Sequence, residues 1–222
     1  MEQTECLIPT YGELTDQQIA LINKNSYVVK HRKGEVIFMQ DRPVSHVIFN
    51  KAGLLKLYKE LEGKKEIILD IVPANHFIGL NSVFYETLYS YSASSIAEGD
   101  IIYTALSAFR DVVSENGKYA LRIMTVLSSQ VVFLIDRMIA LTRKQVPGRM
   151  AEMLLNFSKN TYKNNAFTLP ISRLEIAEFI QTTKETVSRT LTEFKNDRII
   201  ELEEKNVVLK SLDLLEILNK IG

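Results

Sequence analysis

The chain has 222 residues, which is enough for one large domain or two ordinary domains, each with its own hydrophobic core. Hydrophobic residues make up 46% and charged residues 24%, and we find no apolar run of about 18 residues that would predict a membrane span. Net charge is zero. Because Cys6 is the only cysteine, disulfide frameworks and four-thiolate metal or iron–sulfur sites within one chain are excluded.

The N-terminal third of the chain predicts a short helix followed by a β-domain. Residues 15–24 are expected to be helical, with Thr15 and Gln18 forming a capping box. The N-terminus lacks a basic cluster before an apolar core, so we expect no secretory signal and a cytoplasmic protein. From about residue 26 to 106, short segments rich in β-branched and aromatic residues alternate with turn signals, which is typical of a β-sandwich or barrel.

A long helix is predicted after the β-domain. A helix over residues 107–117 ends at Asn116-Gly117, and helical periodicity then continues without a break from about Lys118 to Lys144. Apolar residues recur there at spacings of four and three, as in a coiled-coil seam. The predicted seam consists of Ala120, Met124, Leu127, Val131, Leu134, Met138 and Leu141.

A second apolar stripe lies beside the seam and contains Ile123, Val132, Ile135 and Ile139. We expect one stripe to pack on the chain's own β-domain and the other on the same helix of a second copy. The protein would then be a homodimer. The alternative is a buried core helix in a monomer.

The helical pattern is interrupted at Gln145-Val146-Pro147-Gly148. Pro147 disfavours helix at Val146, and Gly148 is conformationally permissive, so we expect a hinge here. A further helix is predicted from about Arg149 to Tyr162. The resulting division is a β-domain over residues 1–116, a dimerisation helix over 117–144 and a C-terminal domain over 145–222.

Residues 172–194, SRLEIAEFIQTTKETVSRTLTEF, predict two short helices joined by a turn at Gln181-Thr182. Ser172 and Glu175 form a capping box for the first helix, and Thr183 caps the second. This spacing is that of a helix-turn-helix, in which the small Ala177 lets the helices approach closely. The expected buried residues are Leu174, Ile176, Ala177 and Ile180 on the first helix and Val187, Leu191 and Phe194 on the second.

The outer face of the second helix is the candidate DNA-binding surface. Arginine suits the O6 and N7 atoms of guanine, glutamate accepts from the N4 amino group of cytosine, and hydroxyl groups contact bases or phosphates. The other interpretation is a solvated polar face, because basic and acidic residues are equal in number over residues 145–222. The candidate residues are Thr183, Lys184, Glu185, Ser188, Arg189 and Thr192.

The segment after this helix strengthens the DNA-binding interpretation. RIIELEEKNVVLKSL predicts a β-hairpin with its turn at Lys205-Asn206, placed as the wing of a winged helix would be. Residues 212–221 predict a closing amphipathic helix.

The segment over residues 172–194 resembles the C-terminal motif of the CRP/FNR superfamily of bacterial transcription regulators, with its E-I-A run, a turn and E-T-V-S-R-x-L. Upstream, KGEVIFMQDRPVSHVIFNKAGLLKLY resembles the family's β-roll entry, and PGRMAEMLLNF resembles its hinge and following helix. The resemblance covers nearly the whole chain. Gln181 departs from the pattern, because the family often has glycine in this turn.

The resemblance implies an α+β fold: an N-terminal double-stranded β-helix, or jelly-roll-like β-roll, then a long dimerisation helix and a C-terminal winged helix-turn-helix. It also implies a sequence-specific, DNA-binding transcription regulator that acts as a homodimer on palindromic double-stranded DNA, with RNA polymerase as a further partner. Lys184, Glu185 and Arg189 fall where the family reads its operator.

The β-roll departs from the family's cyclic-AMP binders, which use a Gly-Glu pair and a later Arg-Ser pair. Gly79 is kept, but Leu80 stands in place of the glutamate and Tyr91-Ser92 in place of Arg-Ser. The polar pair of the long helix falls at Leu134 and Ile135. A buried phosphate without its arginine would be an unpaired charge, which costs several kcal/mol.

We therefore expect that an effector pocket at Leu80, Tyr91, Ser92, Leu134 and Ile135 does not bind cyclic AMP. The effector is unknown, and a regulator without one is equally open. A single loop histidine, His76, is a weak haem candidate, so no cofactor and no metal site is expected.

Two other classes of function compete with this interpretation. No G-x-S-x-G, phosphate-binding loop, HExxH or cysteine–histidine candidate is found, so we expect no enzymatic activity. The second is a cyclic-nucleotide-fold sensor whose helix-turn-helix mediates protein–protein contacts.

Overall fold

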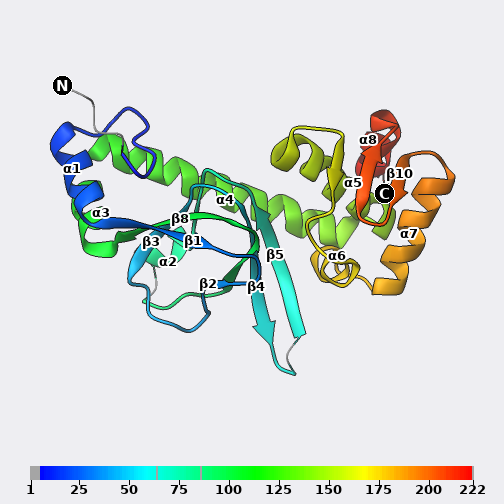
Figure 1. Ribbon diagram of the computed structural model, residues 1–222, viewed down its shortest axis with the longest axis horizontal. Helices are drawn as coiled ribbons and strands as arrows, with labels where there is room; N and C mark the ends of the chain where they lie inside the picture. Colours follow the sequence, from blue (N-terminus) through cyan, green and yellow to red (C-terminus); the bar gives the residue numbers. More distant parts are fainter. Residues whose placement is uncertain (1–5, 64, 86, 222) are drawn as a thin grey trace. The chain divides into compact units, whose positions relative to one another are not determined.

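The computed structural model describes residues 6–63, 65–85 and 87–221 (Figure 1). The chain divides into two units, residues 1–62 with 71–132 and residues 63–70 with 133–222. The N-terminal residues 1–5, which bear on the expected absence of a secretory signal, lie outside the described residues. The three predicted domain ranges are not tested by this division and remain a prediction.

Two four-stranded sheets form the β-roll, with strand orders β1-β8-β3-β6 and β2-β7-β4-β5 (Figure 1). Strand β8 pairs antiparallel with β1 and β3, and β7 pairs antiparallel with β2 and β4. The predicted β-roll is therefore confirmed, although the sequence did not reveal the short β6. The strands are β1 Ser26–His31, β2 Val36–Phe38, β3 His46–Asn50, β4 Leu54–Leu61, β5 Lys65–Val72, β6 His76–Ile78, β7 Ser92–Ala97 and β8 Gly99–Ala105.

Helices α1 (Asp16–Lys24), α2 (Leu80–Phe84) and α3 (Leu106–Glu115) complete the roll. The predicted capping box of α1 is present, since the Thr15 side chain accepts from the Gln18 amide and the Gln18 side chain accepts from the Thr15 amide. The core of this unit is aromatic and aliphatic, and its fully buried members include Ile22, Ile102, Phe109 and Tyr119.

Helix α4 (Gly117–Arg143) has 27 residues and spans roughly 40 Å at 1.5 Å per residue. It begins and ends within one residue of its predicted limits. Tyr119 and Ile123 are fully buried in the core of the roll.

The rest of the second stripe, Val132, Ile135 and Ile139, is exposed in the single chain. Of this stripe only Ile123 packs in the core of the roll, and Leu127 of the seam is partly buried against the same core, so neither stripe as a whole packs on the β-domain. Alternation of apolar residues along a helix does not reveal which stripe a neighbouring sheet will cover.

The second unit contains α5 (Val146–Asn156), a π-helical turn η1 (Phe157–Tyr162), β9 (Ala166–Thr168), α6 (Arg173–Ile180), α7 (Lys184–Asn196), β10 (Ile200–Glu203), β11 (Asn206–Leu209) and α8 (Leu212–Ile221). Strand β11 pairs antiparallel with both β10 and β9. Helix α8 packs on α5, so the predicted closing helix is confirmed.

The predicted break before α5 is displaced. The helix begins at Val146 with Pro147 in its first turn, and the interruption lies at residues 144–145 instead. Proline is tolerated in the first turn because those amides have no intrahelical acceptor and its fixed φ suits the helix. The helix predicted from Arg149 therefore starts three residues earlier, and it gives way to η1 after Asn156.

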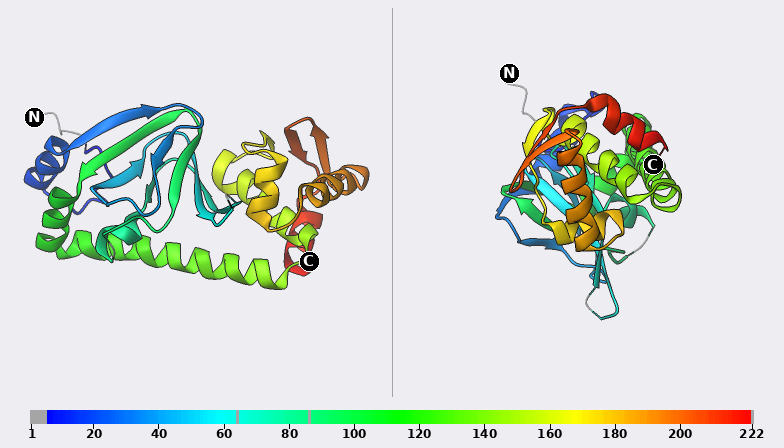
Figure 2. Two further views of the ribbon diagram at one scale, coloured as in Figure 1. Left: turned by 90° about the horizontal axis from the view of Figure 1, so that it is seen from below. Right: turned by 90° about the vertical axis from the view of Figure 1, so that its right-hand side faces the viewer.

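The β10–β11 hairpin follows α7, as predicted for a wing (Figure 2). Its turn lies at Glu204-Lys205 rather than at the predicted Lys205-Asn206, and Asn206 is already in β11. Glu204 adopts the left-handed conformation, with a φ of 52°, that this tight turn requires.

Candidate nucleic-acid interface

Helices α6 and α7 form the predicted helix-turn-helix. Ser172 and Glu175 make the predicted capping box at α6, and Thr183 Oγ1 accepts from the Thr186 amide at the start of α7. Between the helices Gln181 has a φ of 54° and a ψ of 66°, the left-handed conformation for which the family pattern prefers glycine. Ala177 is buried, as expected, and its carbonyl oxygen accepts from the Thr182 amide at 2.9 Å.

The buried sides of the two helices agree with prediction except at one residue. Val187 and Leu191 are fully buried, whereas Leu174 is 55% exposed and Phe179 is buried in its place. Leu174 lies in the first turn of the eight-residue α6, which begins at the surface, whereas Phe179 lies in its last turn, which is buried.

The outer side of α7 presents the predicted residues to solvent. Thr183, Lys184, Glu185, Arg189 and Thr192 are exposed, and Ser188 is half-buried. Their spacing places them on one helix face, opposite the buried Val187 and Leu191. The amino end of this helix also carries the partial positive charge of the helix dipole, which favours a phosphate nearby.

Arg189 is only weakly engaged within the chain. Its Nε lies 3.8 Å from Glu193 Oε1, and the two side chains are 71% and 54% exposed. A solvent-exposed pair of this kind is worth less than about 1 kcal/mol, so the guanidinium can exchange Glu193 for an external acceptor.

Arg173 is a residue of this surface that sequence reasoning missed. It is the first residue of α6, and its Nη1 donates to Ser188 Oγ at 3.2 Å across the two helices. Thr192 Oγ1, in contrast, donates to the Ser188 carbonyl within α7. The sequence did offer one signal for Arg173: it follows the Ser172 cap directly, so it starts the helix that packs across α7.

Helix α4 exposes an apolar surface in the single chain. Leu134 is 54% and Met138 61% exposed, whereas the seam residues Ala120, Leu127 and Leu141 are half-buried. By length and composition α4 could also cross a membrane, so the expectation that no segment is apolar enough was too strong. One such helix is weak evidence, because helices of other proteins that cross no membrane pass the same test. The exposed apolar residues are Leu121, Met124, Val131, Val132, Leu134, Ile135, Met138 and Ile139.

The predicted effector-pocket residues fall into two groups. Leu80 is fully buried in the core of the roll, and Ser92 is buried with its Oγ accepting from the Gln40 amide at 3.0 Å. Tyr91, just before β7, is half-buried. Leu134 and Ile135 lie in the second unit, and both are exposed.

The Tyr91 hydroxyl is bonded to the segment that carries Gly79. It accepts from the Gly79 amide at 3.0 Å and donates to Asn81 Oδ1 at 3.3 Å. Beside it Tyr89 stacks on Phe38 with ring centroids 4.1 Å apart, and burial raises the pKa of Tyr89 to about 12. The hydrogen-bonding and packing partners of the segment around Gly79 are therefore supplied by aromatic side chains of the same chain.

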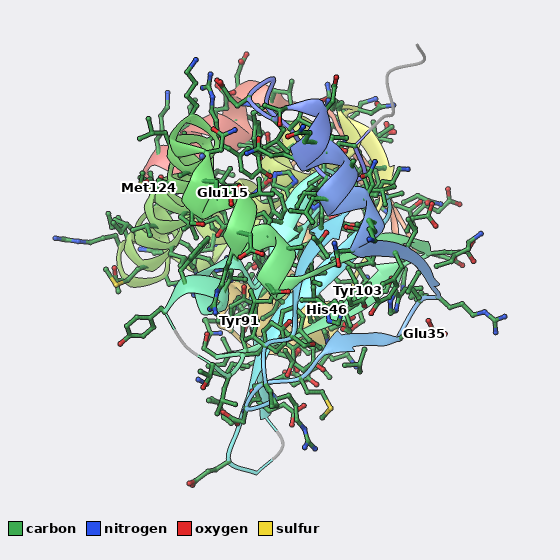
Figure 3. All side chains as sticks on the ribbon, turned by 90° about the vertical axis from the view of Figure 1, so that its left-hand side faces the viewer. Glu35, His46, Tyr91, Tyr103, Glu115 and Met124 are labelled. Atoms are coloured by element: carbon green, nitrogen blue, oxygen red, sulfur yellow. The ribbon has the colours of Figure 1, made fainter. Side chains whose placement is uncertain are left out.

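Each of the three histidine rings has a hydrogen-bonding partner within the chain. His31 Nε2 is 2.9 Å from Tyr103 Oη, and His46 Nδ1 is 2.8 Å from Ser45 Oγ. His46 and Tyr103 are edge-to-face neighbours on adjacent strands (Figure 3). The His76 ring contacts the Ala74 carbonyl. Among the described residues no group of three metal-ligating side chains occurs.

Comparison with known protein families finds matches in both units. The model of the Crp-like helix-turn-helix domain matches residues 148–218, and that of the cyclic nucleotide-binding domain matches residues 28–116.

Two relatives are transcription regulators. The transcriptional activator protein FnrA of Stutzerimonas stutzeri is 27% identical over 188 residues, which cover 82% of this chain and 77% of that protein. The CRP-like cAMP-activated global transcriptional regulator of Mycobacterium tuberculosis is 24% identical over 201 residues, which cover 89% of this chain and 90% of that protein.

Solved structures share the fold. FixK2 from Bradyrhizobium japonicum superimposes with a TM-score of 0.81 at 22% identity, over 87% of this chain and 97% of that chain. A CooA mutant from Carboxydothermus hydrogenoformans superimposes with a TM-score of 0.72 at 23% identity, over 90% and 89%.

Proposed function

Because the chain belongs to the CRP/FNR superfamily of transcription regulators, with a helix-turn-helix DNA-binding domain, we propose that it binds a palindromic operator as a homodimer. The observation that carries this proposal is the outward face of α7. Lys184, Glu185 and Arg189 are exposed there together, on a helix whose other face is fully buried. In a helix-turn-helix such a face enters the major groove, and its N-terminal residues contact base edges.

Each residue has a role on that face. Arg189 pairs with guanine through O6 and N7, and Glu185 accepts from the amino group of cytosine. Thr183 and the amino end of α7 hold a phosphate, and Lys184, Ser188 and Thr192 fix the register on the duplex. Arg173 holds Ser188 in place across the helix pair.

The proposal is tested by selecting binding sites from a library of random duplexes with the full-length protein. We expect enrichment of two inverted half-sites whose centres are about 34 Å apart, one helical turn. Enrichment of a single unpaired half-site would refute the homodimer, and no enrichment at all would refute sequence-specific binding.

The proposed dimer rests on the exposed apolar surface of α4. A single chain leaves Met124, Val131, Leu134 and Met138 more than half exposed, at coiled-coil spacing. The same helix from a second copy would bury these residues. In the resulting arrangement each chain keeps the predicted division into residues 1–116, 117–144 and 145–222.

For the β-roll we propose that the pocket around Gly79 does not bind cyclic AMP. Leu80 is a buried core residue and offers no carboxylate, and the Tyr91 hydroxyl already accepts from the Gly79 amide. A cyclic phosphate would have to break that bond without an arginine to replace it. Titration calorimetry with millimolar cyclic AMP should give no saturable heat, and saturable binding would overturn this proposal.

The competing function is a sensor whose helix-turn-helix contacts another protein. It is favoured only by the balanced charge of residues 145–222. It predicts duplex binding that is weak and independent of sequence, so the site selection above also separates it from DNA reading.

The wider role follows from the relatives. They are transcription regulators rather than enzymes, which supports a non-enzymatic role for this chain. We further propose that the protein acts in the cytoplasm and meets RNA polymerase at its promoters, with an effector still to be identified.

A further inference from the structure

Arg149, near the start of α5, contacts the ends of two other helices. Its Nη1 donates to the carbonyl oxygens of Leu141 at 3.2 Å and Lys144 at 3.0 Å, at the carboxyl end of α4. Its Nη2 donates to the carbonyl oxygen of Gln181, at 3.3 Å, in the turn of the helix-turn-helix. One guanidinium therefore bridges the end of α4 and the end of α6.

Arg137 makes a second contact between α4 and the same end of α6. Its Nη2 donates to the Phe179 carbonyl at 2.6 Å, and its guanidinium lies 3.8 Å from the centre of the Phe179 ring. The same Nη2 also donates to the Ile68 carbonyl at 3.1 Å, within the same unit. Burial lowers the pKa of Arg137, while Asp70 and Glu152 act in the opposite direction.

Hydrogen bonds from a guanidinium group to helix-terminal carbonyl groups hold the two helix ends in a fixed orientation. The last carbonyl groups of a helix have no intrahelical donor and carry the negative end of the helix dipole, so a guanidinium both satisfies and stabilises them. A planar guanidinium fixes several acceptors at defined angles, which a single ammonium group cannot do. Gln181 needs such support because it holds a left-handed backbone conformation without being glycine.

We propose that Arg149 and Arg137 are positioning residues, which fix the carboxyl end of α6 to α4 and so set the direction in which α7 is presented. Helices α6 and α7 pack against each other through buried residues such as Ile176, Ala177 and Leu191 and therefore move together. A shift of α6 on α4 would consequently rotate the DNA-reading face. We call Arg149 and Arg137 together the arginine clamp. The clamp does not contact DNA, because it acts through α6.

The clamp is tested directly by measuring a distance between α4 and α7 in the full-length protein. Spin labels are placed at Thr142 and Lys195, both exposed, after Cys6→Ser replacement. The labelled chain is diluted with unlabelled chain, so that only distances within one chain are recorded by double electron–electron resonance.

We expect a single narrow distance distribution that becomes broad or shifts in Arg149→Met and in Arg137→Met. Arg143→Met is the matched control, since it removes an exposed arginine of the same helix and should leave the distribution unchanged. Arg149→Lys keeps the charge but cannot bridge the three carbonyl groups, so it should also broaden the distance distribution. If Arg149→Met does not fold, Arg149→Lys decides the outcome. A wild-type distribution in the variants would overturn the clamp.

A binding measurement connects the clamp to function, and this part rests on the proposed DNA binding. The operator found by selection is compared with a single half-site and with operators whose half-sites are one or two base pairs closer or further apart. Arg149→Met should lose about tenfold in affinity for the full operator and flatten the spacing preference, while half-site affinity stays within about twofold.

The outcomes separate the two proposals. An equal loss on half-site and full operator would mean that Arg149 only stabilises the domain, which would overturn its positioning role. A wild-type protein without any spacing preference would refute the homodimer, and the label distances would still decide the clamp.

Discussion

The winged domain exposes the polar side chains of its candidate site to solvent, whereas the β-roll hydrogen-bonds those around Gly79 within the chain. On α7, Lys184, Glu185 and Arg189 point to solvent, and the ion pair of Arg189 with Glu193 is long and exposed. Around Gly79 in the roll, the Tyr91 hydroxyl and Ser92 Oγ are bonded to main-chain amides of the same chain. One surface is left open to an external partner, and the other is satisfied internally.

The two surfaces therefore differ in how readily their polar groups can bind an external partner. The family models of a Crp-like helix-turn-helix domain and of a cyclic nucleotide-binding domain both match this chain. In the first, the exposed guanidinium of Arg189 can exchange Glu193 for an external acceptor. The second keeps the fold, while the Tyr91 hydroxyl already accepts from the Gly79 amide, the bond that we propose a cyclic phosphate would have to break.

The largest effect is expected from Leu134→Glu on α4, which places a charge on the exposed apolar seam. Burying an unpaired carboxylate against a second copy is strongly unfavourable, so the variant should be monomeric. Loss of the second half-site should reduce operator affinity by about 100-fold or more. Light scattering and operator titration measure the two consequences.

The matched control for this variant is Ser129→Glu, an exposed α4 position that the helical period places away from the seam. It should remain dimeric. A dimer that survives Leu134→Glu would refute the seam and leave the apolar face of α4 unexplained.

The next largest effect is expected from Arg189→Ala, which removes a side chain that does not support the fold. Operator affinity should fall by about 1–3 kcal/mol, and specificity should relax at one base pair in each half-site. Lys195→Ala, which removes a positive charge from the other end of α7, should weaken all duplexes alike and leave specificity intact. Unchanged specificity in Arg189→Ala would mean that the exposed face of α7 does not read DNA, and the contrast between an open winged domain and an internally bonded β-roll would lose its functional meaning.

A smaller effect is expected from Tyr91→Phe in the β-roll. The Gly79 amide would lose its hydroxyl acceptor, so the free energy of unfolding should fall by about 1 kcal/mol, while operator affinity should not change. Chemical denaturation followed by circular dichroism measures the change. A gain of cyclic AMP binding in this variant would instead indicate that Tyr91 alone closes the pocket.

The smallest effect is expected from Gln181→Gly in the helix-turn-helix. Glycine removes the steric strain of the left-handed conformation but increases the entropy of the unfolded chain. These terms nearly cancel, so we expect stabilisation of no more than about 0.5 kcal/mol. A loss of more than about 1 kcal/mol would mean that the bond from the Gln181 side chain to Glu178 outweighs the strain.

Local rules predicted the elements and caps from the sequence. Thr15 with Gln18, Ser172 with Glu175, and Thr183 all cap the helices for which they were predicted. These signals lie within a few residues of each other, and no tertiary contact is needed to interpret them. The exposed face of α7 followed in the same way from the helical period.

The errors arose where tertiary packing decides the outcome. Leu174 fits an apolar period, but the packing of the domain leaves it exposed and buries Phe179. Arg149 and Arg173 appear as ordinary charged residues, because their partners Gln181 and Ser188 lie 32 and 15 residues away. Short β6 and α2, around Gly79, carry too few residues to establish a period.

The most direct test of sequence-specific DNA reading is a salt titration with two duplexes, the selected operator and a scrambled version of equal length. Affinity for both should fall steeply with salt because phosphate contacts release counterions. At physiological salt the operator should bind at least about 1,000-fold more tightly than the scrambled duplex, and Arg189→Ala should narrow that ratio. Equal affinity for the two duplexes at every salt concentration would contradict the account.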